Sequence, residues 1–160
     1  MDISIDILDG DSIEAACKML DEYAESLDQK AHDGCELVGK VANDAAKERC
    51  SRYTGELADS IRVVDRGDEV LVVADGDGAA FHEFGTGICF GPRNATTAAA
   101  AVDAGWQQGI SGHGGKGWVY PDPLRGFQWT VGQPGTGFMG HGAEKARSAL
   151  ASCFERAFEQ

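Results

Sequence analysis

The stretch that decides the fold reads Ile61-Arg62-Val63-Val64-Asp65-Arg66-Gly67-Asp68-Glu69-Val70-Leu71-Val72-Val73-Ala74. Two runs rich in β-branched residues, 61–65 and 70–74, flank a short polar segment that contains Gly67. Runs of this kind on either side of a glycine-containing turn are typical of a β-hairpin. We therefore predict a small antiparallel sheet near the middle of a chain of 160 residues.

Helical patterns precede the hairpin. Residues 1–8 alternate apolar and polar side chains, which predicts a half-buried strand, and Asp11 and Glu14 then have the spacing of a helix capping box. Apolar residues recur every three or four positions to about residue 28, and again over residues 31–46. This is the periodicity of amphipathic helices, so we predict two N-terminal helices.

The sequence after the hairpin changes character. From about residue 88 to residue 134 it is rich in Gly, Ala, Thr, Trp and Pro and poor in charge, which indicates a long glycine-rich insertion loop. Phe127, Trp129 and Val131 alternate near its end and predict one strand. Apolar residues from Ala143 to Ala157 then predict a terminal amphipathic helix of about 18 residues.

Together these elements predict an α+β fold in which the C-terminal helix packs on the small antiparallel sheet. A length of 160 residues suits a single domain, so we assign 1–160 to one domain with its insertion at about 88–134. The chain contains no run of about 18 apolar residues, and its first residues lack the pattern of a signal peptide. We therefore expect no membrane partner and synthesis in the cytoplasm.

The charge is distributed unevenly. The net charge is −12, and residues 1–88 carry 8 basic and 21 acidic side chains, whereas residues 89–160 carry 6 and 5. Proteins that grip DNA or anionic membranes neutralise phosphates with Lys and Arg, so this acidic half argues against both classes.

The sequence does not match the complete motifs of known catalytic and cofactor sites. The run Gly112-His113-Gly114-Gly115-Lys116-Gly117 matches Gly-x-Gly-x-x-Gly, but Trp118-Val119-Tyr120-Pro121 follows where a dinucleotide site needs a helix. His82-Glu83 lacks the second histidine of the zinc-protease motif His-Glu-x-x-His, because no histidine stands four residues after His82. We therefore predict no catalytic residue, no metal and no cofactor.

Three separated stretches, in order, resemble one family. Thr54-Gly55-Glu56-Leu57-Ala58-Asp59-Ser60-Ile61 resembles its Thr-Gly-x-Leu-x-x-Ser-Ile motif, and Glu83-Phe84-Gly85-Thr86-Gly87 resembles the Glu-x-Gly-Thr that follows a hairpin. The third stretch runs from Trp129 through Pro134 to Phe138-Met139. Together they are similar to the HK97 gp10-like family of tail components of tailed bacteriophages, which are also described as head–tail joining, neck or tail-completion proteins.

The resemblance implies a non-enzymatic virion subunit. It would form a homo-oligomeric ring of six copies between the head connector and the major tail tube or tail terminator protein, with DNA passing through the channel without specific binding. Its assembly motif would comprise Thr54, Gly55, Leu57, Ser60, Ile61, Glu83, Gly85, Thr86, Pro134, Phe138 and Met139. A small enzyme or ligand-binding module that uses the Gly-, His- and Trp-rich loop 105–134 is the alternative.

Several of these residues have expected physical roles. Gly55, Gly85 and Gly87 suit turned or left-handed backbone, and Leu57 and Ile61 should face the core. Thr54 and Ser60 can bond nearby backbone groups. Glu83 has no obvious local purpose, so we expect either a bond across a subunit boundary in the ring or a surface carboxylate beside a turn. Phe138 and Met139 should anchor the terminal helix on the sheet.

Overall fold

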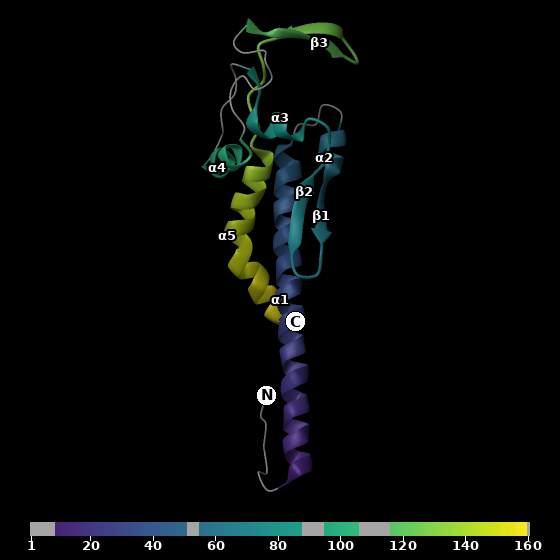
Figure 1. The fold of residues 1–160 in the computed structure, drawn as a ribbon, viewed down its shortest axis with the longest axis vertical. Coiled ribbons are helices and arrows are strands. Elements are labelled where there is room, and N and C mark those ends of the chain that lie inside the picture. The colour runs from purple at the N-terminus through teal and green to yellow at the C-terminus, as the bar shows by residue number, and fades with distance from the viewer. Residues whose placement is uncertain (1–8, 51–54, 88–94, 106–115, 160) are drawn as a thin grey trace.

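A computed structural model describes residues 9–50, 55–87, 95–105 and 116–159. The molecule is elongated, with one long helix running along most of its length (Figure 1). The elements in chain order are α1 Gly10–Arg49, α2 Glu56–Ser60, β1 Ile61–Asp65, β2 Val70–Ala74, α3 Ala79–Phe84, α4 Ala95–Asp103, β3 Trp118–Asp122, β4 Gly126–Thr130 and α5 Phe138–Glu159. The α+β class is confirmed. The predicted strand over residues 1–8 lies outside the described residues.

The prediction of two N-terminal helices is wrong, because α1 is a single helix of 40 residues. It begins after Asp9, whose carboxylate accepts a hydrogen bond from the N–H of Asp11 at 3.1 Å. The residues between the two predicted helices include neither proline nor glycine, so nothing there interrupts the backbone. At 1.5 Å per residue α1 is about 60 Å long. Neither α1 nor another described helix is long and apolar enough to cross a membrane.

The C-terminal helix packs mainly against α1, not on a sheet as predicted. Glycines allow the two helices to approach closely. A Cβ atom added to Gly34 would lie 3.0 Å from the ring of Phe154. A Cβ atom added to Gly142 would lie 2.6 Å from the carbonyl oxygen of Ala42. Near the end of α5, Lys30 Nζ donates to the carbonyl of Phe158 at 3.3 Å. The part of α1 before this point extends past the end of α5 (Figure 1).

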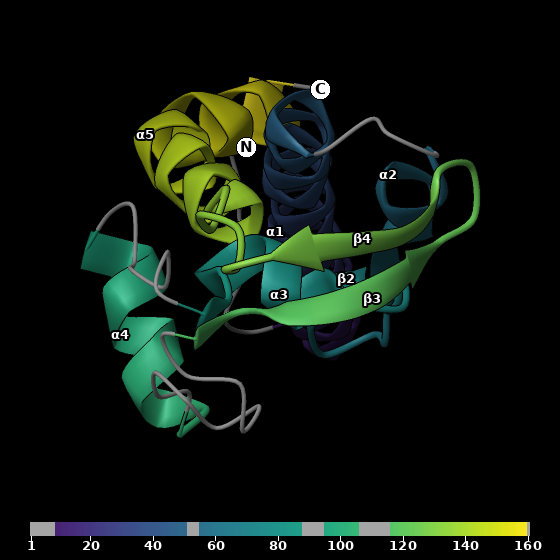
Figure 2. The same ribbon diagram turned by 90° about the horizontal axis from the view of Figure 1, so that it is seen from above.

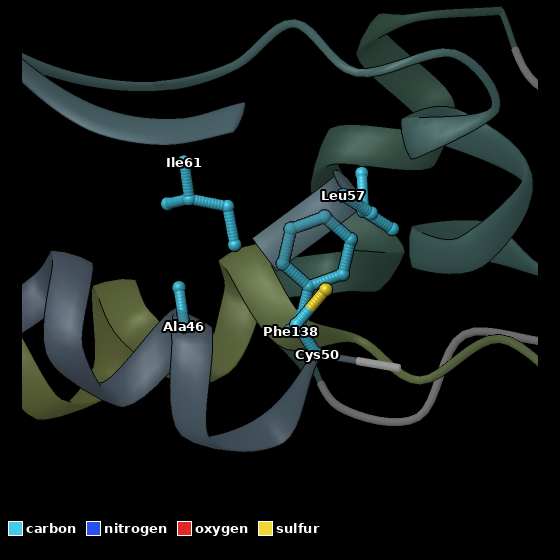
Figure 3. Packing of buried hydrophobic residues seen from close by; sticks show 5 residues of the cluster. All are labelled: Ala46, Cys50, Leu57, Ile61 and Phe138. Atoms are coloured by element: carbon cyan, nitrogen blue, oxygen red, sulfur yellow. The ribbon is translucent and has the colours of Figure 1, made fainter. Parts of the chain in front are cut away.

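The predicted hairpin is confirmed. β1 and β2 are antiparallel, with Ile61 opposite Ala74 and Asp65 opposite Val70, and both strands pack on α1. A core cluster lies where α1, α2, β1 and α5 meet, and Figure 3 shows the side chains pointing toward one another. Its members are Ala46, Cys50, Leu57, Ile61 and Phe138. The predicted burial of Leu57 and Ile61 is therefore correct.

The predicted insertion loop contains regular structure. Besides α4, it holds a second antiparallel hairpin, β3–β4, in which Trp118 pairs with Thr130 and Asp122 with Gly126. The prediction of one strand was incomplete, because its partner β3 contains Pro121 and lacks a clear alternation of its own. This hairpin lies across the end of the molecule over α3, and α4 stands to one side of α5 (Figure 2).

Candidate functional site

The second and third motif stretches meet in space. Gly85 and Pro134 form an isolated antiparallel bridge. Next to it, the Thr86 N–H donates to the Gln133 carbonyl at 2.8 Å, and the Gln133 N–H donates to Thr86 Oγ1 at 3.0 Å. These reciprocal hydrogen bonds tie the end of α3 to the segment that enters α5. We call this region, residues 82–87 with 131–140, the junction.

The carboxylate of Glu83 is the centre of the junction. Glu83 is only 6% exposed. Its Oε2 accepts the N–H of Met139 at 2.8 Å, and its Oε1 accepts the N–H of Gly140 at 3.0 Å and the hydroxyl of Thr97 at 2.9 Å. The first N–H groups of a helix have no partner within the helix and carry partial positive charge, so an anion there is favourable. Glu83 thus caps α5 and holds α4 beside it.

The expectation of a surface carboxylate is therefore wrong, and a bond across a subunit boundary stays a prediction. The carboxylate is buried, and both of its oxygens accept hydrogen bonds from groups of its own chain. Sequence reasoning missed this role because the two backbone partners lie 56 and 57 positions further along the chain. The one local signal was the charge itself, since an unpaired carboxylate is rarely placed in an apolar stretch such as Ala79–Phe84.

The junction admits little change in backbone. Gly87 has φ 60° and Gly132 has φ 114°. A side chain on Gly87 would overlap the carbonyl of Val131, and one on Gly132 would overlap the carbonyl of Thr86. Further hydrogen bonds run from the Thr136 N–H to the His82 carbonyl at 2.6 Å and from the Gly137 N–H to the Glu83 carbonyl at 3.1 Å.

The first motif stretch lies beside the core cluster instead. Thr54 falls outside the described residues, and Gly55 has the expected left-handed backbone, with φ 83°. Ser60 Oγ donates to the Leu57 carbonyl at 2.7 Å, which confirms its predicted local bond. Phe138 is fully buried in the cluster and links this stretch to the junction. Phe138 anchors the start of α5 in this cluster, whose members come from α1 and α2 as well as β1, so the predicted anchoring on the sheet is only partly correct.

A pocket of about 420 Å³ lies between α3 and the β3–β4 hairpin. Among the described residues its lining holds no carboxylate, thiol or lysine; it is made by Gly78, Phe81, His82, Thr86, Trp118, Tyr120, Thr130, Gly132 and Gln133. Burial lowers the pKa of His82, because a charged imidazole is poorly solvated there. The described lining therefore offers aromatic surface and hydrogen-bonding groups.

The other side of the β3–β4 hairpin is apolar and faces outward. Val119 and Trp129 are cross-strand partners, and Phe127 lies two residues before Trp129 on the same side of β4. Their exposed fractions are 59%, 65% and 80% for Val119, Trp129 and Phe127, and Leu124 in the turn is 78% exposed. We call Val119, Phe127 and Trp129 the outward face.

The projecting part of α1, residues 10–28, also leaves apolar side chains uncovered. Ile13, Leu20 and Tyr23 are all exposed. They are accompanied by six carboxylates and one lysine, Lys18. These exposed apolar side chains and the outward face belong to elements that Figure 1 places at opposite ends of the long axis of the molecule.

Comparison with known proteins finds no matching family model, no similar curated protein and no similar solved structure.

Proposed function

We propose that the chain is a structural subunit of a tailed-bacteriophage virion, made in the bacterial cytoplasm, that assembles into a ring. In this proposal the ring has six copies, joins the head connector to the tail tube or tail terminator protein, and leaves a channel for DNA. The three motif stretches that resemble neck and tail-completion proteins motivate this function. The observation that carries it is the outward face of the β3–β4 hairpin.

An outward face of this kind is unusual for a protein that works alone. Soluble monomers rarely keep large contiguous apolar patches in water, and such patches mark surfaces that bind another protein. Val119, Phe127 and Trp129 are adjacent on one side of a two-stranded ribbon, which is itself marginal without a covering partner. Trp and Phe are also the residues that interfaces favour. We expect the outward face to be buried in the assembled ring.

The projecting part of α1 supplies a second, different surface. When two different surfaces of a chain bind each other in successive copies, the contact is heterologous and produces a ring if the rotation closes. The acidic character of residues 1–88 fits a channel, because carboxylates repel the phosphates of passing DNA. We propose that part of this acidic half lines the lumen. Reversing lumenal charges should then slow DNA passage and leave assembly intact.

The test is the mass of the full chain in solution, measured by light scattering and complemented by negative-stain images. We expect rings of the wild-type chain, alone or with connector and tail-tube proteins. Phe127→Lys with Trp129→Lys should prevent assembly while the circular dichroism spectrum and Tm stay unchanged. Val102→Lys is the matched control, because Val102 is 79% exposed but stands alone on α4. A wild-type chain that remains monomeric in every mixture would refute the proposal.

The alternative is a small enzyme or ligand-binding module that uses residues 105–134. The aromatic pocket beneath the hairpin favours it, since Trp118 and Tyr120 belong to that segment. A structure of the assembled protein distinguishes the two functions. A small molecule enclosed between α3 and the hairpin would support the alternative, and a hairpin buried against a neighbouring subunit would support the ring.

A further inference from the structure

Three side chains that can bind a metal lie together between α1 and the β1–β2 hairpin. His32 and Glu36 are four residues apart on α1 and therefore share one face of the helix. Asp65 is the last residue of β1. One potential ligand atom from each residue lies within 4.8 Å of the other two. His32 Nε2 and Asp65 Oδ2 are 3.1 Å apart.

Both carboxylates are held in place by groups outside the cluster. Asp65 Oδ1 accepts the N–H of Gly67 at 2.8 Å, which leaves Oδ2 directed toward His32. Lys40 Nζ contacts Glu36 Oε2 at 3.0 Å. Metal-binding carboxylates in proteins are commonly oriented by such outer hydrogen bonds. The cluster is accessible to ions, because the side chain of His32 is 26% exposed and that of Asp65 is 45% exposed.

We propose that His32, Glu36 and Asp65 bind one divalent transition-metal ion of the Zn²⁺ type. One imidazole nitrogen and two carboxylate oxygens form a donor set that suits Zn²⁺, whereas Mg²⁺ and Ca²⁺ favour oxygen alone. Two ligand atoms about 3 Å apart can both lie at about 2.0–2.2 Å from one ion. Water fills the remaining coordination. The ion fastens the β1–β2 hairpin to α1, and this inference does not depend on the virion function.

The sequence patterns predicted no metal and missed this cluster. The zinc patterns considered were pairs of closely spaced cysteines and the motif His-Glu-x-x-His. Neither pattern covers a histidine followed four residues later by a glutamate, as in His32 and Glu36. That spacing was the available local signal, but the third ligand is 33 positions from His32 and reaches it only through the packing of the hairpin on α1.

The experiment titrates Zn²⁺ into the full chain after chelator treatment, followed by calorimetry and by the Tm. Cys17, Cys35 and Cys89 are replaced by serine throughout, because exposed thiols such as Cys17 and Cys35 also bind zinc. We expect one ion per chain, a Tm that rises by several degrees at saturation, and no displacement by excess Mg²⁺.

Two variants locate the site. His32→Ala and Asp65→Asn should each weaken zinc affinity at least about 10-fold and abolish the rise in Tm. The amide introduced by Asp65→Asn keeps a side-chain oxygen that can still accept the Gly67 N–H, so this variant preserves the turn and tests the ligand without disrupting the hairpin. The matched control is Glu22→Gln, because Glu22 pairs with Lys18 at 3.8 Å as Glu36 pairs with Lys40. This control should bind zinc like the parent.

The opposite results would overturn the inference. A parent chain that takes up no zinc means that His32 and Asp65 form an ordinary hydrogen-bonded pair. Equal binding by the parent, His32→Ala and Asp65→Asn means that the ion binds elsewhere. Circular dichroism of each variant establishes that it is folded before the titration.

Discussion

The junction and the β3–β4 hairpin are adjacent in the chain but differ in the burial of their side chains. In the junction both oxygens of Glu83 are hydrogen-bonded and Phe138 is fully buried. In the hairpin the large aromatic side chains of Phe127 and Trp129 are mostly exposed to solvent. The junction holds the chain's own helices together, whereas in our proposal the outward face binds another subunit.

The sharpest form of this comparison is a pair of phenylalanine truncations. Phe138→Ala should lower the free energy of unfolding by about 3–5 kcal/mol, because it opens a cavity in the core cluster. Phe127→Ala should change it by less than about 0.5 kcal/mol, since little burial is lost. Denaturant unfolding of the unassembled chain measures both values. Similar losses at the two positions would show that the hairpin is part of the core.

A second pair compares two glutamates near the start of α5. Glu83→Gln keeps the shape of the side chain but removes the charge that faces the Met139 and Gly140 N–H groups, so we expect a loss of about 1–3 kcal/mol. Glu144→Gln is the control: Glu144 is exposed and its oxygen lies 3.5 Å from Thr96 Oγ1, so the loss should stay below about 0.5 kcal/mol. Thermal unfolding at pH 7 ranks the two variants, and equal Tm values would argue against a capping role for Glu83.

A third pair tests the reciprocal hydrogen bonds of the junction. Thr86→Val removes the hydroxyl that accepts the Gln133 N–H and should cost about 1 kcal/mol. Thr96→Val removes only the long contact to Glu144 and should have little effect on the free energy of unfolding. Urea denaturation provides the comparison. If Thr96→Val proved the more damaging change, the hydroxyl of Thr86 would not secure the junction.

The smallest expected effect is a dependence on pH at the boundary between the two regions. Burial holds the pKa of His82 below its ordinary value of 6.5, so the unfolded chain takes up a proton more readily than the folded chain. Stability from this source is present above about pH 6.5 and declines as the pH falls below it. His82→Gln should flatten the pH dependence of the Tm between about pH 7.5 and 5.5. Parallel curves for the two proteins would contradict this prediction.

What the sequence predicts well is local. The β1–β2 hairpin follows from two β-branched runs around Gly67, and its strands have the predicted bounds. The left-handed backbone of Gly55 and the bond of Ser60 to Leu57 also involve neighbours in the chain. Such features depend on interactions within a few residues, which a single sequence displays.

The features that the sequence does not predict depend on contacts between residues that are far apart in the chain. The periodicity of α1 suggests two helices because its apolar positions shift, although no residue there breaks a helix. Gly34 looks unfavourable in a helix until the ring of Phe154 is seen against it. The cap of α5 by Glu83 and the meeting of His32 with Asp65 likewise arise only when separate elements pack together.

The length of α1 has a consequence for motion as well as for shape. Residues 31–49 of this helix are braced by α5 and the β1–β2 hairpin, whereas most of residues 10–28 extend past α5. Among residues 10–28 only Ala16 is buried, and a helix segment with few packed side chains opens at a low free energy, so amide hydrogens should exchange with solvent in a gradient along one continuous helix. Binding of a partner to the projecting part would slow exchange there first. Hydrogen exchange in the projecting part of α1 would then be a direct measure of assembly.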